Sequence, residues 1–267
     1  MKQIVKPVVV LFTFIFSASL AQNRNYLFQG ERINYSISYG LINAGELDVF
    51  VDTTTYNVDK RICYKAQMTG RTIGAVGLFA KILNTYTSYI DTSDLLSYKF
   101  VRVQNENDYT LYETSEFDRN DNISLVSRRK DDQSIELKSY KIQKGIQDIV
   151  STYFKLRNIN FDTISRNKLV HINMFWEDTT INIAIKFIGK QKLKTPMGRI
   201  NTWIVAPIVP QTKNSILLST DPVKAWITND KYRIPVKIQL NTKWGSIDAD
   251  IVNYNLIQKK KLKFLFF

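Results

Sequence analysis

The sequence predicts a mainly β fold, in which a large curved antiparallel sheet forms a barrel or half-barrel with one or two short helices. Three observations support this prediction. Apolar and polar residues alternate along most of the chain, short polar turns separate the alternating segments, and only two segments depart from the pattern. Parallel strands need long crossover connections, so closely spaced strands favour antiparallel pairing. A sheet with this many strands curls or splits into two layers.

Alternation with a period of two is the pattern of a strand that buries one face. It is clearest over residues 33–39 and 181–188, where Ile, Tyr and Phe alternate with polar or small residues. The polar second face of these strands favours an interior filled by side chains. The other strand-like segments are 47–51, 61–69, 84–91, 97–105, 109–117, 122–129, 134–141, 168–176, 199–206, 223–228, 234–240 and 246–256.

Turns between these segments are rich in residues that favour turn conformations. Asn and Asp tolerate left-handed backbone conformations, and Gly adopts them without strain. The clearest turns are Asn105–Asp108, Asp118–Asp121, Asp131–Asp132 and Thr195–Gly198. Gly45 and Gly198 are expected to serve the backbone geometry of turns through positive φ.

Two segments break the alternation. Apolar residues of 146–157 follow the i, i+3, i+4, i+7 spacing of a helix with one apolar face. Asp148 lies in the first turn of this expected helix, where a negative charge suits the helix dipole. The second segment, 73–82, is small and apolar nearly all round, which fits either a short buried helix or a loop on an apolar rim.

Segment 73–82 supplies the candidate ligand-binding residues. Burying each large apolar side chain would stabilise the fold by roughly 1.5–3 kcal/mol, so packing against the sheet is the default expectation. The alternative is a mobile lid over an apolar cavity, since Gly74 and Gly77 loosen the backbone. The four candidates are Val76, Leu78, Phe79 and Ile82.

The first 21 residues have the pattern of a cleavable secretory signal peptide. A positively charged start precedes the apolar residues 8–16, and the small residues Ser19 and Ala21 follow at the spacing that signal peptidase accepts. The apolar stretch is about half the length of a membrane-spanning helix. We therefore expect cleavage before Gln22, and a periplasmic or otherwise exported protein. It should be soluble after cleavage, because no cysteine for lipid attachment lies at the cleavage site.

The chain is basic, with 37 Lys and Arg against 24 Asp and Glu, a formal net charge of +13. Part of this charge belongs to the expected signal peptide and part to a basic and aromatic tail over 259–267. The rest is spread along residues 22–258, which we expect to form a single antiparallel β domain. Diffuse basic charge favours solubility and weak attraction to anionic envelope surfaces. We expect no nucleic-acid partner and no stable membrane span.

Catalytic and metal-binding residue types are scarce. His171 and Cys63 are the single histidine and the single cysteine, which excludes a disulfide within the chain and argues against a zinc site. We expect both to be structural, and we expect no metal and no cofactor. Asp248 and Asp250 would share one strand face and resemble a carboxylate pair. A solvated strand face is the simpler interpretation, as it is for Glu31 and Glu46, so no catalytic residue is assigned.

The tryptophans are a further feature that function could use. Exposed aromatic rings stack on sugars, whereas buried rings fill a core. Filling the core is the commoner role, and we expect it for Trp176, Trp203, Trp226 and Trp244.

Several short motifs resemble a family of exported bacterial proteins called domain of unknown function 3108. In order they are Phe28–Glu31, Tyr39-Gly40, Ala44-Gly45, Tyr86–Asp91, Gln147-Asp148, Thr195–Gly198, Trp226–Val236 and Gly245–Ile247. Their order and spacing extend over residues 27–256, and the composition is similar to that of a Bacteroidetes member. The resemblance implies an envelope location and an antiparallel β fold, and it implies no chemistry. The 259–267 tail departs from the family pattern.

These observations favour an exported envelope protein that binds a hydrophobic or amphipathic ligand, such as a lipid, without enzymatic activity. The alternative is a structural or interaction module that recruits other envelope proteins through its surface. An envelope glycan or lipid hydrolase comes third. The interior volume of the folded protein would separate the first two.

Overall fold

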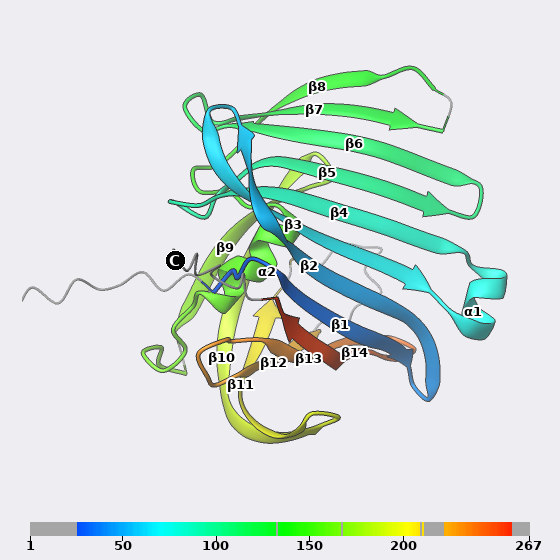
Figure 1. Ribbon diagram of the computed structural model, residues 1–267, viewed down its shortest axis with the longest axis vertical. Coiled ribbons are helices and arrows are strands. Elements are labelled where there is room, and N and C mark those ends of the chain that lie inside the picture. Colours follow the sequence, from blue (N-terminus) through cyan, green and yellow to red (C-terminus); the bar gives the residue numbers. More distant parts are fainter. Residues whose placement is uncertain (1–25, 132, 167, 209, 211–221, 258–267) are drawn as a thin grey trace, which may run out of the picture.

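The computed structural model describes residues 26–131, 133–166, 168–208, 210 and 222–257. Within these residues, fourteen strands form one antiparallel sheet that curves strongly around its inner face (Figure 1). The strands are β1 (Glu31–Tyr39), β2 (Ile42–Val58), β3 (Arg61–Thr72), β4 (Ile82–Asp91), β5 (Ser97–Glu106), β6 (Tyr109–Asp118), β7 (Ile123–Lys130), β8 (Glu136–Lys141), β9 (Leu169–Trp176), β10 (Thr179–Thr195), β11 (Gly198–Ile208), β12 (Val223–Thr228), β13 (Pro235–Thr242) and β14 (Gly245–Leu256).

Consecutive strands pair with each other except β8 and β9, and one long-range ladder, between β1 and β14, joins the two halves of the sheet. The strand order runs from β8 through β1 and β14 to β9, which leaves β8 and β9 at the two edges. Over the described residues the sheet is therefore curved but not closed. The predicted mainly β fold is confirmed in its half-barrel form.

Every predicted strand segment corresponds to a strand of the structure. The main difference is length, because β2 and β10 each have 17 residues and extend well beyond the predicted 47–51 and 181–188. The predicted turns also adopt the expected geometry, with positive φ at Asn107, Asp131 and Gly198. Local patterning thus identified the elements and underestimated how far two of them continue.

Both segments that broke the alternation are helical. Helix α2 (Ile149–Arg157) begins after Asp148, whose carboxylate accepts a hydrogen bond from the Ser151 backbone N–H at 2.7 Å. Asp148 is therefore the N-cap of a capping box. Helix α1 (Gly74–Phe79) is a short helix between β3 and β4, and none of its residues is buried.

The hydrophobic core lies on the concave face of the sheet, where α2 is enclosed (Figure 1). Val150 and Phe154 of α2 pack into a cluster with β1–β7, and Ile149 also contacts a second cluster around Trp203 on β9–β12. The helix thus fills the space that an empty half-barrel would leave open.

The expected signal peptide, 1–21, and the tail, 259–267, lie outside the described residues, so both remain predictions. Among the residues that are described, no helix is long and apolar enough to cross a membrane.

Candidate functional site

The interior of the half-barrel is closed by buried polar contacts as well as by apolar packing. Arg157, in the last turn of α2, donates to both carboxylate oxygens of Glu31 on β1, at 2.6 and 2.8 Å. The same guanidinium donates to the backbone carbonyls of Tyr232 and Arg233. At the other end of α2, Ser88 Oγ donates to Asp148 Oδ2 at 2.6 Å. Both ends of the helix are therefore tied to the sheet.

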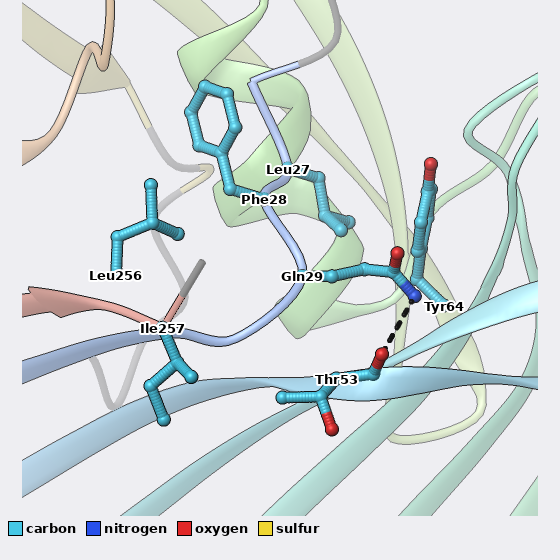
Figure 2. A pocket seen from close by; sticks show the side chains of 7 residues that line it. All are labelled: Leu27, Phe28, Gln29, Thr53, Tyr64, Leu256 and Ile257. Atoms are coloured by element: carbon cyan, nitrogen blue, oxygen red, sulfur yellow. Dashed lines mark hydrogen bonds between the residues drawn. The ribbon is translucent and has the colours of Figure 1, made fainter. Parts of the chain in front are cut away.

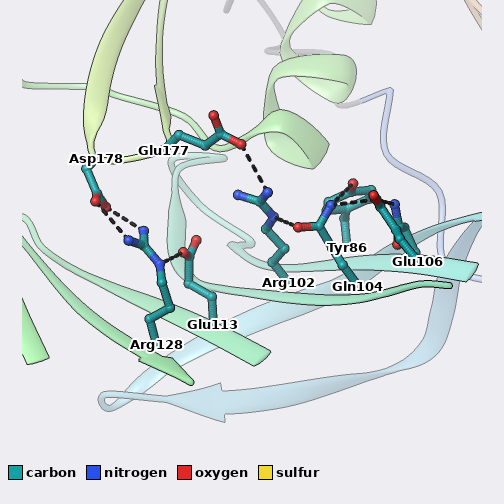
Figure 3. Close-up of polar contacts among 9 residues, drawn as sticks. Tyr86, Arg102, Gln104, Glu106, Glu113, Arg128, Glu177 and Asp178 are labelled. Atoms are coloured by element: carbon teal, nitrogen blue, oxygen red, sulfur yellow. Dashed lines mark hydrogen bonds and ion pairs between the residues drawn. The ribbon is translucent and has the colours of Figure 1, made fainter. Parts of the chain in front are cut away.

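The hairpin between β9 and β10 covers the inner face of β5–β7 through ion pairs (Figure 3). Arg128 on β7 donates to both oxygens of Asp178, at 2.9 and 2.6 Å, and to Glu113 on β6 at 2.5 Å. Arg102 on β5 donates to Glu177 at 3.0 Å. The hydrogen bonds from Arg128 hold the pKa of Asp178 below its usual value. These contacts form a polar seam where the two halves of the curved sheet approach each other.

A small groove lies where the first and last described segments meet (Figure 2). Its volume is about 290 Å³, and Leu27, Phe28 and Ile257 form much of its apolar wall. The Gln29 amide donates to the backbone carbonyl of Thr53 at 3.4 Å. Small-ligand sites are usually about 300–1,000 Å³, so this groove would hold only a small apolar group.

Helix α1 presents the candidate residues that the sequence predicted, and they do not pack as expected. Leu78 and Phe79 are 78 % and 87 % exposed, while Val76 and Ile82 are half-buried. The default expectation that the segment packs against the sheet is therefore wrong for Leu78 and Phe79. The structure also places α1 at one end of the sheet rather than over its concave interior (Figure 1).

Other exposed apolar residues lie beside α1. Leu41 lies in the β1–β2 turn, Ile42 begins β2, and Trp244 in the β13–β14 turn is 71 % exposed. We define the apolar rim as the six exposed side chains on these three adjacent connections: Tyr39, Leu41, Ile42, Leu78, Phe79 and Trp244.

Hydrogen bonds join the three connections to one another. The Ile73 N–H donates to the Ala44 carbonyl at 3.1 Å, which attaches the start of α1 to β2. The Tyr39 hydroxyl donates to the Trp244 carbonyl at 2.6 Å, which links the β1–β2 and β13–β14 turns. Thr72 Oγ1 donates to the Ala80 carbonyl at 2.6 Å and closes the α1 loop on itself. These hydrogen bonds hold the three connections together, while the side chains of the apolar rim remain exposed.

The residues considered for catalysis have structural surroundings. His171 is exposed on β9, with Nδ1 2.8 Å from Asn182 Oδ1. Cys63 is buried, and burial raises the pKa of its thiol to about 11. Lys237 Nζ lies 3.5 Å from Asp248 and 3.3 Å from Asp250. A lysine therefore stands between the two carboxylates.

The remaining acidic candidates have cationic partners. Glu31 pairs with Arg157 inside the half-barrel, and Glu46 pairs with Arg71 on the surface. Among the described residues, no group of three or more His, Cys, Asp or Glu side chains is placed to hold a metal ion.

The sequence predicted the two rim residues on α1, Leu78 and Phe79, and did not predict the other four. The sequence predicts a core position for Trp244, and it assigns no binding role to Tyr39, Leu41 or Ile42. The available signal was their position: Leu41 follows Gly40 directly, and Trp244 lies between Lys243 and Gly245. Large apolar residues at the tip of a tight turn have little opportunity for burial.

Gly45 also differs from expectation. It lacks a positive φ, and it is required instead because a Cβ at this position would lie 2.7 Å from the Arg71 carbonyl oxygen on β3.

A curved, open antiparallel sheet wrapped around a short helix defines this chain as a β-barrel-like protein. It is similar in fold to the crystal structure of a beta-barrel-like protein of domain of unknown function DUF1849 from Brucella abortus. The TM-score is 0.56 at 11 % sequence identity, over 86 % of this chain and 99 % of that chain. The family model "Protein of unknown function (DUF3108)" matches residues 34–252, so the chain belongs to this family. No curated protein matches the chain.

The family assignment agrees with the resemblance seen in the sequence, and the structure gives several of its motifs a physical role. Glu31 pairs with Arg157, Ser88 bonds the N-cap Asp148, and the Gln147 carbonyl accepts from the Phe175 N–H at 2.7 Å. The motif residues therefore surround α2 and hold it inside the sheet.

Proposed function

We propose that this chain is an exported, non-enzymatic protein of the cell envelope that binds a hydrophobic or amphipathic ligand at its surface, through the apolar rim. The carrying observation is the exposure of Leu78 and Phe79 on α1, together with that of Leu41, Ile42 and Trp244 on the two neighbouring connections. Contiguous exposed apolar surface marks binding sites more often than chance exposure does. Covering such surface is favourable by about 25 cal/mol for each Å² removed from water.

The filled interior directs the ligand to the surface. Helix α2, the Arg157–Glu31 pair and the two hydrophobic clusters occupy the concave face, where an acyl chain would otherwise lie. A structural module that recruits another envelope protein through the same rim is the second candidate, and the same filled interior favours it. A hydrolase comes third, because His171 is exposed and bonded to Asn182, and Lys237 stands between Asp248 and Asp250.

The ligand hypothesis is tested with a monomeric amphiphile, a lysophospholipid below its critical micelle concentration. Binding is measured by native mass spectrometry for the unaltered protein, Phe79→Asp and Ile62→Asp. Ile62 is a matched control because it is 59 % exposed and lies at the far end of β3 from α1. We expect binding in the unaltered protein and the control, and loss in Phe79→Asp. No binding in any of the three, or equal binding in all three, would contradict the proposal.

Export is tested separately by the N-terminus of protein recovered from the envelope fraction. Mass spectrometry should find a chain that begins at Gln22. An intact Met1 on the folded protein would exclude cleavage of the signal peptide.

A further inference from the structure

We infer that the apolar rim docks on the surface of an anionic phospholipid bilayer. The inference rests on the proposed function and specifies the ligand: phospholipid presented as the surface of a bilayer.

The first support is that the three connections project from one end of the sheet. Antiparallel pairing of Tyr39 with Ile247 brings the β1–β2 and β13–β14 turns together. Pairing of Gly45 with Thr72 places α1 next to the β1–β2 turn. The tips protrude side by side, so a flat partner can contact all three at once.

The second support is the kind of residue at the tips. Leu41, Leu78 and Phe79 are aliphatic or aromatic, and Trp244 and Tyr39 carry rings with one polar atom. Trp and Tyr are enriched at the level of lipid headgroups, where the ring is partly buried and its polar atom stays hydrated. Apolar side chains on a polar scaffold insert into the boundary between headgroups and acyl chains without spanning the membrane.

The third support is charge. The three connections, residues 39–45, 72–82 and 242–247, contain Lys81 and Lys243 and no Asp or Glu. Both lysines are exposed. The next acidic residues along the strands, Glu46 and Asp248, are paired with Arg71 and Lys237. Lysines that flank inserted apolar residues favour anionic headgroups, and this argues for a charged bilayer over an apolar groove in another protein.

The test measures cosedimentation with vesicles of phosphatidylglycerol and phosphatidylethanolamine, and with vesicles of phosphatidylcholine alone. Each form of the protein is expressed as the full chain and purified from the same kind of cell. Four forms are compared: the unaltered protein, Leu78→Asp with Phe79→Asp, Lys81→Glu with Lys243→Glu, and the control Ile62→Asp. All four share the same termini, so differences between them report on the rim and not on residues outside the described structure.

We expect the unaltered protein and Ile62→Asp to bind anionic vesicles equally, and the Leu78/Phe79 variant to bind more than tenfold more weakly. The affinity of the lysine variant for anionic vesicles should fall about fivefold or more for each lysine replaced. This difference from the unaltered protein should shrink as salt is added. Brominated lipids should quench the emission that disappears in Trp244→Phe, because Trp244 would lie at the headgroup level.

Equal binding by the Leu78/Phe79 variant and the control, or no quenching of Trp244, would overturn bilayer docking. If lysophospholipid binds through Phe79 while vesicles do not bind, docking fails and the proposed function stands. If neither lysophospholipid nor vesicles bind the unaltered protein, both fail.

Discussion

Arg157 and Glu31 form a bidentate ion pair inside the half-barrel, with side chains that are 0 % and 1 % exposed. One residue ends helix α2 and the other begins β1, so the pair fastens the helix to the first strand across 126 positions of sequence. The carbonyls of Tyr232 and Arg233 accept further hydrogen bonds from the same guanidinium, which satisfies a charge that burial would otherwise make costly.

Glu31→Gln removes the countercharge and leaves the Arg157 guanidinium buried. We expect the free energy of unfolding to fall by about 3–5 kcal/mol, measured by urea denaturation. Glu46→Gln is the matched control, because its pair with Arg71 is exposed and should contribute less than about 1 kcal/mol. Equal effects of the two substitutions would contradict the anchoring role of Arg157.

Asp148→Asn should change how stability depends on pH. Burial raises the pKa of Asp148 above its usual value, so the folded state holds this proton more tightly than the unfolded state. The stabilisation is complete below the unfolded pKa of 3.8 and is lost as pH rises through the folded pKa. The unaltered protein should therefore lose stability relative to Asp148→Asn between pH 4 and neutrality.

Asp178→Asn should change the pH dependence of stability in the opposite direction. The pKa of Asp178 is lowered by hydrogen bonds from Arg128, so its contribution is present near neutrality and is lost as pH falls. Unfolding curves collected from about pH 2 to pH 7 would test both signs, because the contribution of Asp178 is lost only below its unfolded pKa of 3.8. If the stability of Asp148→Asn and that of the unaltered protein depend on pH in the same way, burial does not raise the pKa of the Asp148 carboxyl.

The polar seam should hold the β9–β10 hairpin against β5–β7. Replacing Asp178 by Asn changes a two-contact ion pair into a hydrogen bond from the charged Arg128 guanidinium to a neutral amide oxygen, at a cost of about 1.5–3 kcal/mol. Amide hydrogen exchange should accelerate over residues 174–182 and stay unchanged in β1–β3. Glu116→Gln, in the exposed pair with Lys99, serves as the control and should leave the hairpin protected. Unchanged exchange in Asp178→Asn would mean that apolar packing alone holds the seam.

Comparing Gly45→Ala with Gly70→Ala tests whether Gly45 is needed because there is no room for a side chain, and not because of its backbone conformation. Neither glycine has a positive φ; a Cβ at position 45 would lie 2.7 Å from the Arg71 carbonyl oxygen, whereas a Cβ at position 70 meets nothing within 4 Å. We expect Gly45→Ala to destabilise the protein by about 1–3 kcal/mol, and Gly70→Ala to be neutral or stabilising by about 0.5–1 kcal/mol. Thermal unfolding of both variants provides the comparison, and equal melting temperatures would refute it.

The local elements of this protein could be predicted from residue patterns alone. Period-two alternation located all fourteen strands of the described chain, and helical spacing with Asp148 located α2, because each signal depends only on neighbouring residues. It also singled out Leu78 and Phe79, since their segment, 73–82, breaks the alternation and is apolar nearly all round. The β-barrel-like class followed from the number of strands and the short turns between them.

Only the tertiary structure decided how those elements meet. The pairing of β1 with β14 brings Tyr39 to Trp244, and the curvature of the sheet brings Glu31 to Arg157. These contacts join positions more than a hundred residues apart, and no local pattern encodes them. The filled interior, the open edges at β8 and β9, and the gathering of three apolar tips at one end all depend on how far the sheet twists and curls. Twist and curl are set by the packing of the whole sheet around α2.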